Sequence, residues 1–119
     1  MMKELSAVKY TEQKSRFYAH FYKIDKYSDI EELLKKHKRK YKKANHHCYA
    51  AIISEQDYFK DDGEVGHPGK AMLEILKKKE LDSHLIIVSR IFGGIKLGVG
   101  GVTRAFRAAC EGVIEIRKK

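Results

Sequence analysis

Residues 85–88 constrain the fold more than any other segment, because they form the most apolar run in the chain. A strand that faces solvent on one side alternates apolar and polar residues, whereas a strand covered on both faces is continuously apolar. We therefore predict a central strand, extending to about Phe92, that is buried on both sides.

The periodicity of apolar residues predicts the other elements. Residues 16–24 alternate as a strand does, and their aromatic side chains favour a pleated sheet. Ser28 and Glu31 have the spacing of a capping box, and Pro68 suits the first turn of a helix. The expected elements are a strand at 16–24, a helix at 28–41, strands at 46–54 and 56–60, a helix from 68, a strand at 85–92 and a helix at 102–116.

This order predicts an α+β fold: a two-layer sandwich in which a mainly antiparallel four-stranded sheet carries its helices on one face. A length of 119 residues with 43% hydrophobic residues fits one domain, 1–119. The sequence shows neither a secretion signal nor the ~20 apolar residues needed to span a bilayer. We expect a cytoplasmic protein without membrane contact, in which Cys48 and Cys110 are reduced core residues.

The formal net charge of +9 predicts attraction to RNA or DNA that weakens with salt. The basic run 35–43 can meet a phosphate backbone, although cations at a helix C-terminus also favour the helix dipole. Solubility is an alternative explanation of the charge. Aromatic residues alternate along 16–24, and they could stack bases if one face of the strand is open.

The glycine-rich segment 93–101 carries the strongest chemical signal. Its glycines permit positive φ and let backbone amides approach a ligand before a helix N-terminus, where anions are favoured. Lys96 and Arg104 could add positive charge. The alternative is a tight strand-to-helix turn without a ligand. The glycines are Gly93, Gly94, Gly98, Gly100 and Gly101.

The acidic segment Asp61, Asp62, Gly63 and Glu64 could hold a divalent cation or supply a general base. Turn formation with salt bridges to nearby cations is the alternative, since Asp-Gly is a common turn pair.

A histidine and cysteine cluster at 46–48 suggests zinc, but strand alternation separates His46 and Cys48 from His47. No local spacing supplies further zinc ligands, so we predict no metal site. An exposed His46 or His47 could instead contact phosphate.

Four motifs, in order along the chain, resemble those of the IMPACT (UPF0029) family, specifically its N-terminal domain. They are K-S-R-F at 14–17, A-N-H-H-C-Y-A at 44–50, D-D-G-E at 61–64, and R-I-F-G-G-I-K-L-G-V-G-G at 90–101 followed by Arg104. The resemblance implies a fold shared with a small-subunit ribosomal protein domain and with domain IV of elongation factors. It also implies a link to the regulation of translation.

From this resemblance and the charge we predict a nucleic-acid-binding or ribosome-associated module, with RNA preferred to DNA. A protein partner in translation control is also expected. The anticipated anion contacts are Lys14, Arg16, His46, His47, Arg90, Gly93, Gly94, Lys96, Gly98, Gly100, Gly101 and Arg104.

Two alternatives stay open. One is an enzyme or binding protein for a small phosphate or metal ligand, held between the acidic and glycine-rich segments. The other is a protein-interaction module. The sequence identifies no catalytic residue, reaction or cofactor.

Overall fold

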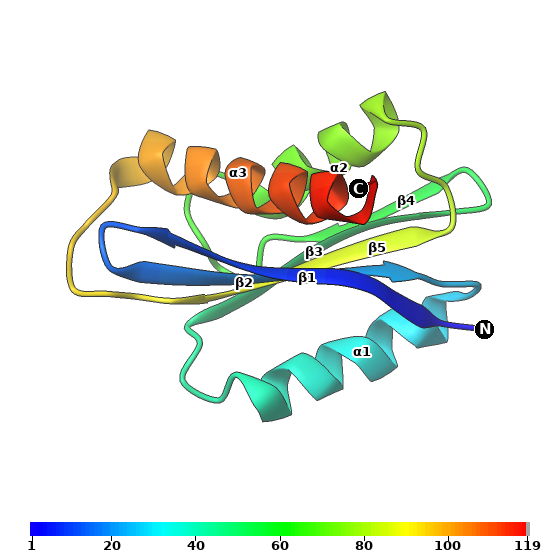
Figure 1. Ribbon diagram of the computed structural model, residues 1–119, viewed down its shortest axis with the longest axis horizontal. Coiled ribbons are helices and arrows are strands. Elements are labelled where there is room, and N and C mark those ends of the chain that lie inside the picture. The colour runs from blue at the N-terminus through cyan, green and yellow to red at the C-terminus, as the bar shows by residue number, and fades with distance from the viewer. Residues whose placement is uncertain (119) are drawn as a thin grey trace.

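The computed structural model describes residues 1–118 and shows one five-stranded antiparallel sheet with three helices (Figure 1). The strands lie in the order β1-β2-β5-β3-β4. The elements are β1 (Lys3–Glu12), β2 (Ser15–Lys23), α1 (Tyr27–Lys40), β3 (His46–Ile53), β4 (Gln56–Lys60), α2 (Pro68–Lys78), β5 (His84–Ile91) and α3 (Gly98–Lys118). The α+β class and the antiparallel sheet are as predicted.

The strand predicted to be central, β5, is the middle strand of the sheet. β5 lies between β2 and β3, and Leu85, Ile86, Ile87 and Val88 have no exposed surface. The predicted hairpin is also confirmed, because Ile53 at the end of β3 pairs with Gln56 at the start of β4.

The sheet has five strands rather than the predicted four, because the sequence analysis missed β1. This strand pairs with β2, but its register shifts between Glu4 and Ser6. A bulge reverses which side chains face each side of a sheet. Leu5, Val8 and Tyr10 pack against one core, but they do not occupy strictly alternating positions. A search of the sequence for alternating apolar residues therefore does not detect this strand.

The prediction that all helices lie on one face was wrong. α2 and α3 cover one face of the sheet, whereas α1 covers the other (Figure 1). Phe17 and Phe106 belong to the core under α2 and α3, and Tyr22, Ile30 and Leu33 belong to the core under α1. A sheet whose central strands are apolar on both faces must be covered on both, which gives three layers.

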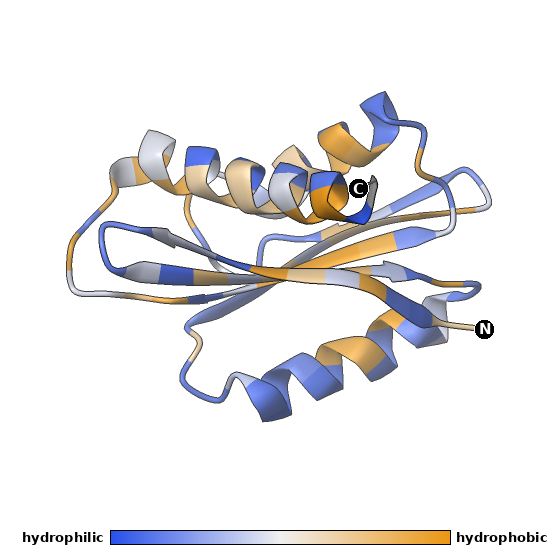
Figure 2. Ribbon diagram, viewed as in Figure 1, coloured by the Kyte–Doolittle hydropathy of each residue, from blue (hydrophilic) through white to orange (hydrophobic). Residues whose placement is uncertain are grey.

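The helix α1 shows why one apolar stripe is enough to fix its position. In Figure 2 the ribbon of α1 alternates between hydrophobic and hydrophilic segments, as an amphipathic helix does. Its start differs from the predicted capping box of Ser28 and Glu31. The Asp29 carboxylate instead accepts hydrogen bonds from the backbone amides of Asp25 and Lys26, at 2.9 and 3.2 Å.

The last helix begins at Gly98, earlier than the predicted Val102. Glycine has a low intrinsic helix propensity, which argued for a loop. The buried side chains of Val102, Phe106 and Val113 favour the long helix, since helix stability in proteins comes mainly from packing. Gly98, Gly100 and Gly101 therefore lie in the first turn, where backbone amides have no acceptor within the helix.

No helix among residues 1–118 combines the length and the apolar character needed to cross a membrane.

Candidate functional site

The first carboxylate of the acidic segment caps a helix. Asp61 Oδ1 accepts hydrogen bonds from the amides of Gly69 and Lys70, at 2.8 and 3.2 Å, and Oδ2 lies 3.0 Å from His67 Nδ1. His67 precedes α2 with a left-handed φ of 49° and makes no side-chain cap. Asp61 therefore supplies, from six residues upstream, the acceptor that an N-cap side chain normally provides.

The second carboxylate fixes a turn to β3. Asp62 Oδ2 accepts a hydrogen bond from the backbone amide of His47 at 2.8 Å, and the carbonyl oxygen of Asp62 lies 2.8 Å from His46 Nδ1. Asp62 and Gly63 both have positive φ, at 51° and 74°. This is the turn chemistry that the sequence analysis gave as the alternative to a cation site.

The third carboxylate forms a buried ion pair. Arg90 Nη1 lies 2.8 Å from Glu64 Oε2, and both side chains are almost completely buried. The Arg90 guanidinium also lies 5.6 Å from the Phe17 ring centroid and 5.8 Å from that of Phe92. Glu64 Oε2 is 3.6 Å from His46 Nε2. The acidic segment is thus bound to protein groups, and within residues 1–118 no three metal-ligating side chains converge.

Both cysteines are buried, as predicted. Burial, followed by the carboxylates of Glu64, Asp62 and Asp61, raises the pKa of the Cys48 thiol. Burial raises the pKa of Cys110 to about 12. Both side chains therefore remain thiols near neutral pH and do not provide a thiolate nucleophile.

The amides at the start of the glycine-rich segment and just before it are bonded within the protein. The Phe92 amide donates to Asn45 Oδ1 at 3.1 Å, and the Gly93 amide donates to Ser15 Oγ at 3.2 Å. Gly93 lies against the Lys14 backbone so closely that a Cβ there would be 2.1 Å from the Lys14 carbonyl oxygen. The close approach of the β1–β2 turn at Lys14 therefore requires that residue 93 be glycine.

Lys96 is exposed between two clefts. One cleft of about 420 Å³ also contains His46, Arg90 and Gly98. A second cleft of about 430 Å³ also contains Gly101 and Arg104. These clefts bring together part of the predicted anion site.

The other six predicted contacts line neither cleft; they are Lys14, Arg16, His47, Gly93, Gly94 and Gly100. His47 is buried on the α1 face of the sheet, where its Nδ1 lies 2.7 Å from Ser89 Oγ. Arg16 lies in a different cleft, beside the end of α1.

The cleft around Arg16 combines cations with aromatic rings. Tyr18 and Tyr41 stack with centroids 4.5 Å apart and an interplanar angle of 22°. The cleft has a volume of about 470 Å³, and none of its lining residues is acidic. We call this group the Tyr18–Tyr41 cluster; its members are Arg16, Tyr18, Lys40, Tyr41, Lys42 and Lys43.

Comparison with known proteins places the chain in a family. The Impact N-terminal domain matches residues 13–114, which is most of the sequence. YvyE of Bacillus subtilis, described as an IMPACT family member, is 40% identical over 109 residues, covering 87% of this chain and 50% of YvyE. The chain belongs to the IMPACT family. It spans about half the length of the curated relatives it matches first.

Two solved structures share the fold of this IMPACT domain. A crystal structure described only as that of a hypothetical protein superposes with a TM-score of 0.87 at 29% identity, covering 92% of this chain and 56% of that one. Yih1, described as a two-domain translational regulator, gives a TM-score of 0.55 at 21% identity, covering 96% and 46%. The second likeness shows the fold alone.

This IMPACT domain also contains a buried polar network that the sequence analysis did not identify. His37 Nε2 lies 2.9 Å from Tyr22 Oη, and His37 Nδ1 lies 2.9 Å from Ser89 Oγ. Ser89 Oγ also lies 2.7 Å from His47 Nδ1. Because a serine hydroxyl has one proton, Ser89 donates to one imidazole and accepts from the other, so both contacts form with neutral rings.

The physical cause of that neutrality is burial. Burial, followed by the positive potential of neighbouring groups, lowers the pKa of His37 to about 2. Burial also lowers the pKa of His47. His37 follows Leu33 by four residues on the buried stripe of α1, and this spacing is the signal that could have identified it.

A second pair of polar contacts lies beside this network. His20 Nδ1 lies 2.6 Å from Glu4 Oε1, and His20 Nε2 lies 2.6 Å from Tyr41 Oη. Burial lowers the pKa of His20, although Glu4 acts in the opposite direction. Tyr41 therefore connects the Tyr18–Tyr41 cluster at the surface to a buried histidine.

Proposed function

We propose that this IMPACT domain is a cytoplasmic nucleic-acid-binding or ribosome-associated module in the regulation of translation, and that RNA is its preferred ligand. The observation that carries this proposal is the Tyr18–Tyr41 cluster. Proteins hold single strands by stacking bases on aromatic rings while cations contact the phosphates. Tyr18 and Tyr41, which stack on each other, and the cations around them are the residue types that such binding uses.

Two further observations support the proposal. The net charge of +9 favours association with a polyanion. The fold is shared with Yih1, a protein described as a translational regulator.

The direct test measures binding of a labelled single-stranded RNA by fluorescence anisotropy at about 50 and about 200 mM salt. The affinity should fall steeply as salt rises. Substituting Lys42→Gln and Lys43→Gln together should weaken binding and reduce the salt slope by about 1.4, because each contact with a single strand contributes about 0.7.

A double variant with the same charge change, Lys78→Gln with Lys79→Gln, is the control, since both lysines are exposed at the end of α2 on the opposite face of the sheet. It should retain most of the affinity. The absence of RNA binding at low salt would contradict the proposal, as would equal effects of the two double variants. A DNA strand of the same sequence tests the preference for RNA.

The clefts around Lys96, which are lined partly by α3 and share no residue with the Tyr18–Tyr41 cluster, are a second candidate surface for RNA. Lys96→Ala should weaken RNA binding by the loss of one phosphate contact, reducing the salt slope by about 0.7. An unchanged slope would limit the RNA surface to the Tyr18–Tyr41 cluster.

A further inference from the structure

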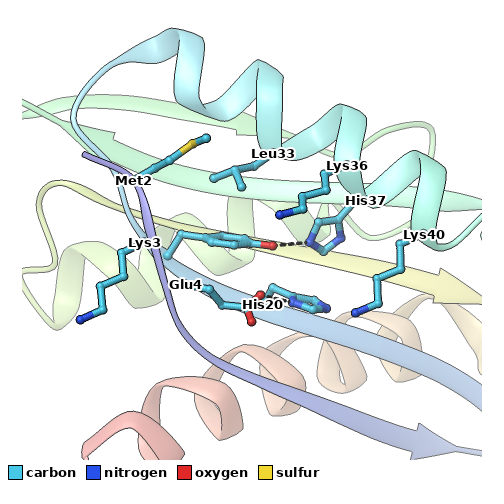
Figure 3. Close-up of a pocket in the computed structure, with 9 residues that line it drawn as sticks. Met2, Lys3, Glu4, His20, Leu33, Lys36, His37 and Lys40 are labelled. Atoms are coloured by element: carbon cyan, nitrogen blue, oxygen red, sulfur yellow. Dashed lines mark hydrogen bonds and ion pairs between the residues drawn. The ribbon is translucent and has the colours of Figure 1, made fainter.

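A pocket of about 290 Å³ opens between the start of β1 and the inner face of α1 (Figure 3). His20, Tyr22 and His37 line it from the sheet side and from α1, and Met2 and Leu33 provide apolar surface. The pocket is outside the motifs that identify the family, and it is separate from both clefts around Lys96.

Two local features of the sequence build this pocket. The register shift between Glu4 and Ser6 turns Glu4 toward His20 on the α1 face of the sheet, while Ser6 bonds to α3 on the other face through the Val113 carbonyl. On α1, residues three and four apart share one side of a helix. Leu33, Lys36, His37 and Lys40 have that spacing, and all four line the pocket.

The pocket has an excess of positive charge. Figure 3 shows Lys36 and Lys40 extending from α1 toward β1 and the Glu4–His20 pair, with Lys3 on the β1 side. Within residues 1–118, none of these three lysines forms a salt bridge. The one carboxylate in the pocket, Glu4, is already held at 2.6 Å by His20.

The electrostatic effect of the lysines reaches the buried histidines. The pKa of His37 is lowered to about 2, first by burial, then by the neighbouring His20 and His47, and then by Lys40 and Lys36. Burial is the main cause that lowers the pKa of His20; Glu4 opposes it, and Lys40 adds a smaller lowering. A bound anion would be stabilised by the same potential that disfavours an additional proton.

We propose that this pocket binds a phosphate monoester, with the Lys36 and Lys40 ammonium groups contacting the phosphate and with Met2 and Leu33 contacting the adjoining organic group. Lysine binds phosphate as a point charge, and the two ammonium groups of Lys36 and Lys40 match the charge of about −1.5 to −2 that a phosphate monoester carries near pH 7. The volume is at the lower limit for ligand pockets, so the pocket admits a terminal phosphate with little more than its neighbouring group.

Two sources can supply that chemistry: a free nucleoside monophosphate, or the 5′-phosphorylated end of an RNA strand. The second source rests on the proposed function. It is included because Lys40 lines both this pocket and the Tyr18–Tyr41 cluster, and because Tyr41 is hydrogen-bonded to His20. A strand bound on the cluster could therefore place its end beside the pocket.

The test uses isothermal titration calorimetry with adenosine monophosphate and with adenosine, which lacks the phosphate. The monophosphate should bind and adenosine should not. Lys36→Gln should weaken the monophosphate about tenfold or more, because it removes a hydrogen bond to a charged group. Lys35→Gln makes the same charge change at an exposed α1 position outside the pocket, and it should change the affinity less than about twofold. The imidazole NMR signals of His20 and His37 should shift on addition of the monophosphate.

A second comparison uses one short RNA with either a 5′-phosphate or a 5′-hydroxyl. Tighter binding of the phosphorylated strand, lost in Lys36→Gln, would identify the strand end as the source. Monophosphate binding without that difference would identify the free nucleotide. The proposal is overturned if neither phosphate source binds better than its hydroxyl counterpart, or if Lys35→Gln weakens binding as much as Lys36→Gln. The monophosphate arm is independent of Lys42 and Lys43, so its failure is distinguishable from failure of RNA binding.

Discussion

The ion pair between Glu64 and Arg90 shows how a motif residue can serve the fold. The side chains of Glu64 and Arg90 are 3% and 8% exposed, so little solvent screens either group and each is compensated mainly by the other. Glu64→Gln should destabilise the protein by about 3–5 kcal/mol, because it leaves a buried guanidinium without a compensating charge. Urea unfolding measured by circular dichroism gives the difference in free energy.

An exposed ion pair in the same protein is the control. Lys77 Nζ and Asp57 Oδ2 are 2.9 Å apart, close to the 2.8 Å of the buried pair, but both side chains are substantially exposed. Asp57→Asn should cost less than about 1 kcal/mol. Equal losses in the two variants would contradict the importance of burial.

Single residues were predicted best where their chemistry is local. The Asp-Gly turn and the two core cysteines followed from residue type and spacing alone, and the structure contains both. The partner of Arg90 is 26 positions away in sequence, and the partner of His37 on β5 is 52 positions away. No periodicity within a short window indicates which distant groups meet, so these contacts could not be predicted.

At the scale of elements, the β1–β2 hairpin is positioned by its contact with the end of β5. Because a Cβ at Gly93 would lie 2.1 Å from the Lys14 backbone, one of the two segments must move in Gly93→Ala. We expect a loss of about 1–3 kcal/mol of unfolding free energy, as for other overpacked sites.

The matched substitution is Gly112→Ala in α3. A Cβ there meets no atom within 4 Å, and the residue is helical. Alanine should therefore stabilise the protein by about 0.5–1 kcal/mol. Opposite signs in thermal unfolding support the described packing, and destabilisation by both substitutions would contradict it.

Elements with uninterrupted periodicity were predicted, and interrupted ones were not. β5 and the β3–β4 hairpin followed from apolar patterns and turn residues. β1 was missed because the shift after Glu4 interrupts its alternation, and the start of α3 was missed because packing outweighs the low helix propensity of its glycines. The same shift places Glu4 in the pocket under α1, so the missed strand and the missed pocket have one cause.

At the scale of the whole molecule, the position of α1 decides which candidate sites exist. Its coverage of the second sheet face creates the pocket with Lys36 and Lys40, and it brings Tyr41 onto Tyr18. The amphipathic stripe of α1 fits either face of a sheet that is apolar on both. The face that α1 covers depends on how all the layers pack, which short sequence motifs do not specify. The motifs therefore identified the family, but they could not predict the Tyr18–Tyr41 cluster.

The network beneath α1 predicts how stability depends on pH. His37 connects α1 to Tyr22 on β2 and to Ser89 on β5, and Ser89 connects to His47 on β3. The pKa of His37 is about 2 in the folded protein and about 6.5 in an unfolded chain. Between these values the unfolded chain binds a proton that the folded protein excludes, so stability is complete above about pH 6.5 and falls as the pH decreases.

From about pH 7.5 to about pH 5.5, His37 alone should lower the free energy of unfolding by about 1.4 kcal/mol. Burial also lowers the pKa values of His20, His47 and His84, and each adds a loss of the same sign.

His37→Gln removes one such proton site. The variant should be less stable at about pH 7.5, because the hydrogen bonds to Tyr22 and Ser89 are disturbed, but its further loss at about pH 5.5 should be smaller than that of the wild type by about 1.4 kcal/mol. Urea unfolding at both pH values measures the two losses. Parallel pH dependences in wild type and variant would mean that His37 accepts a proton in the folded protein, which is incompatible with its buried position between α1 and the sheet and with its hydrogen bonds to Tyr22 and Ser89.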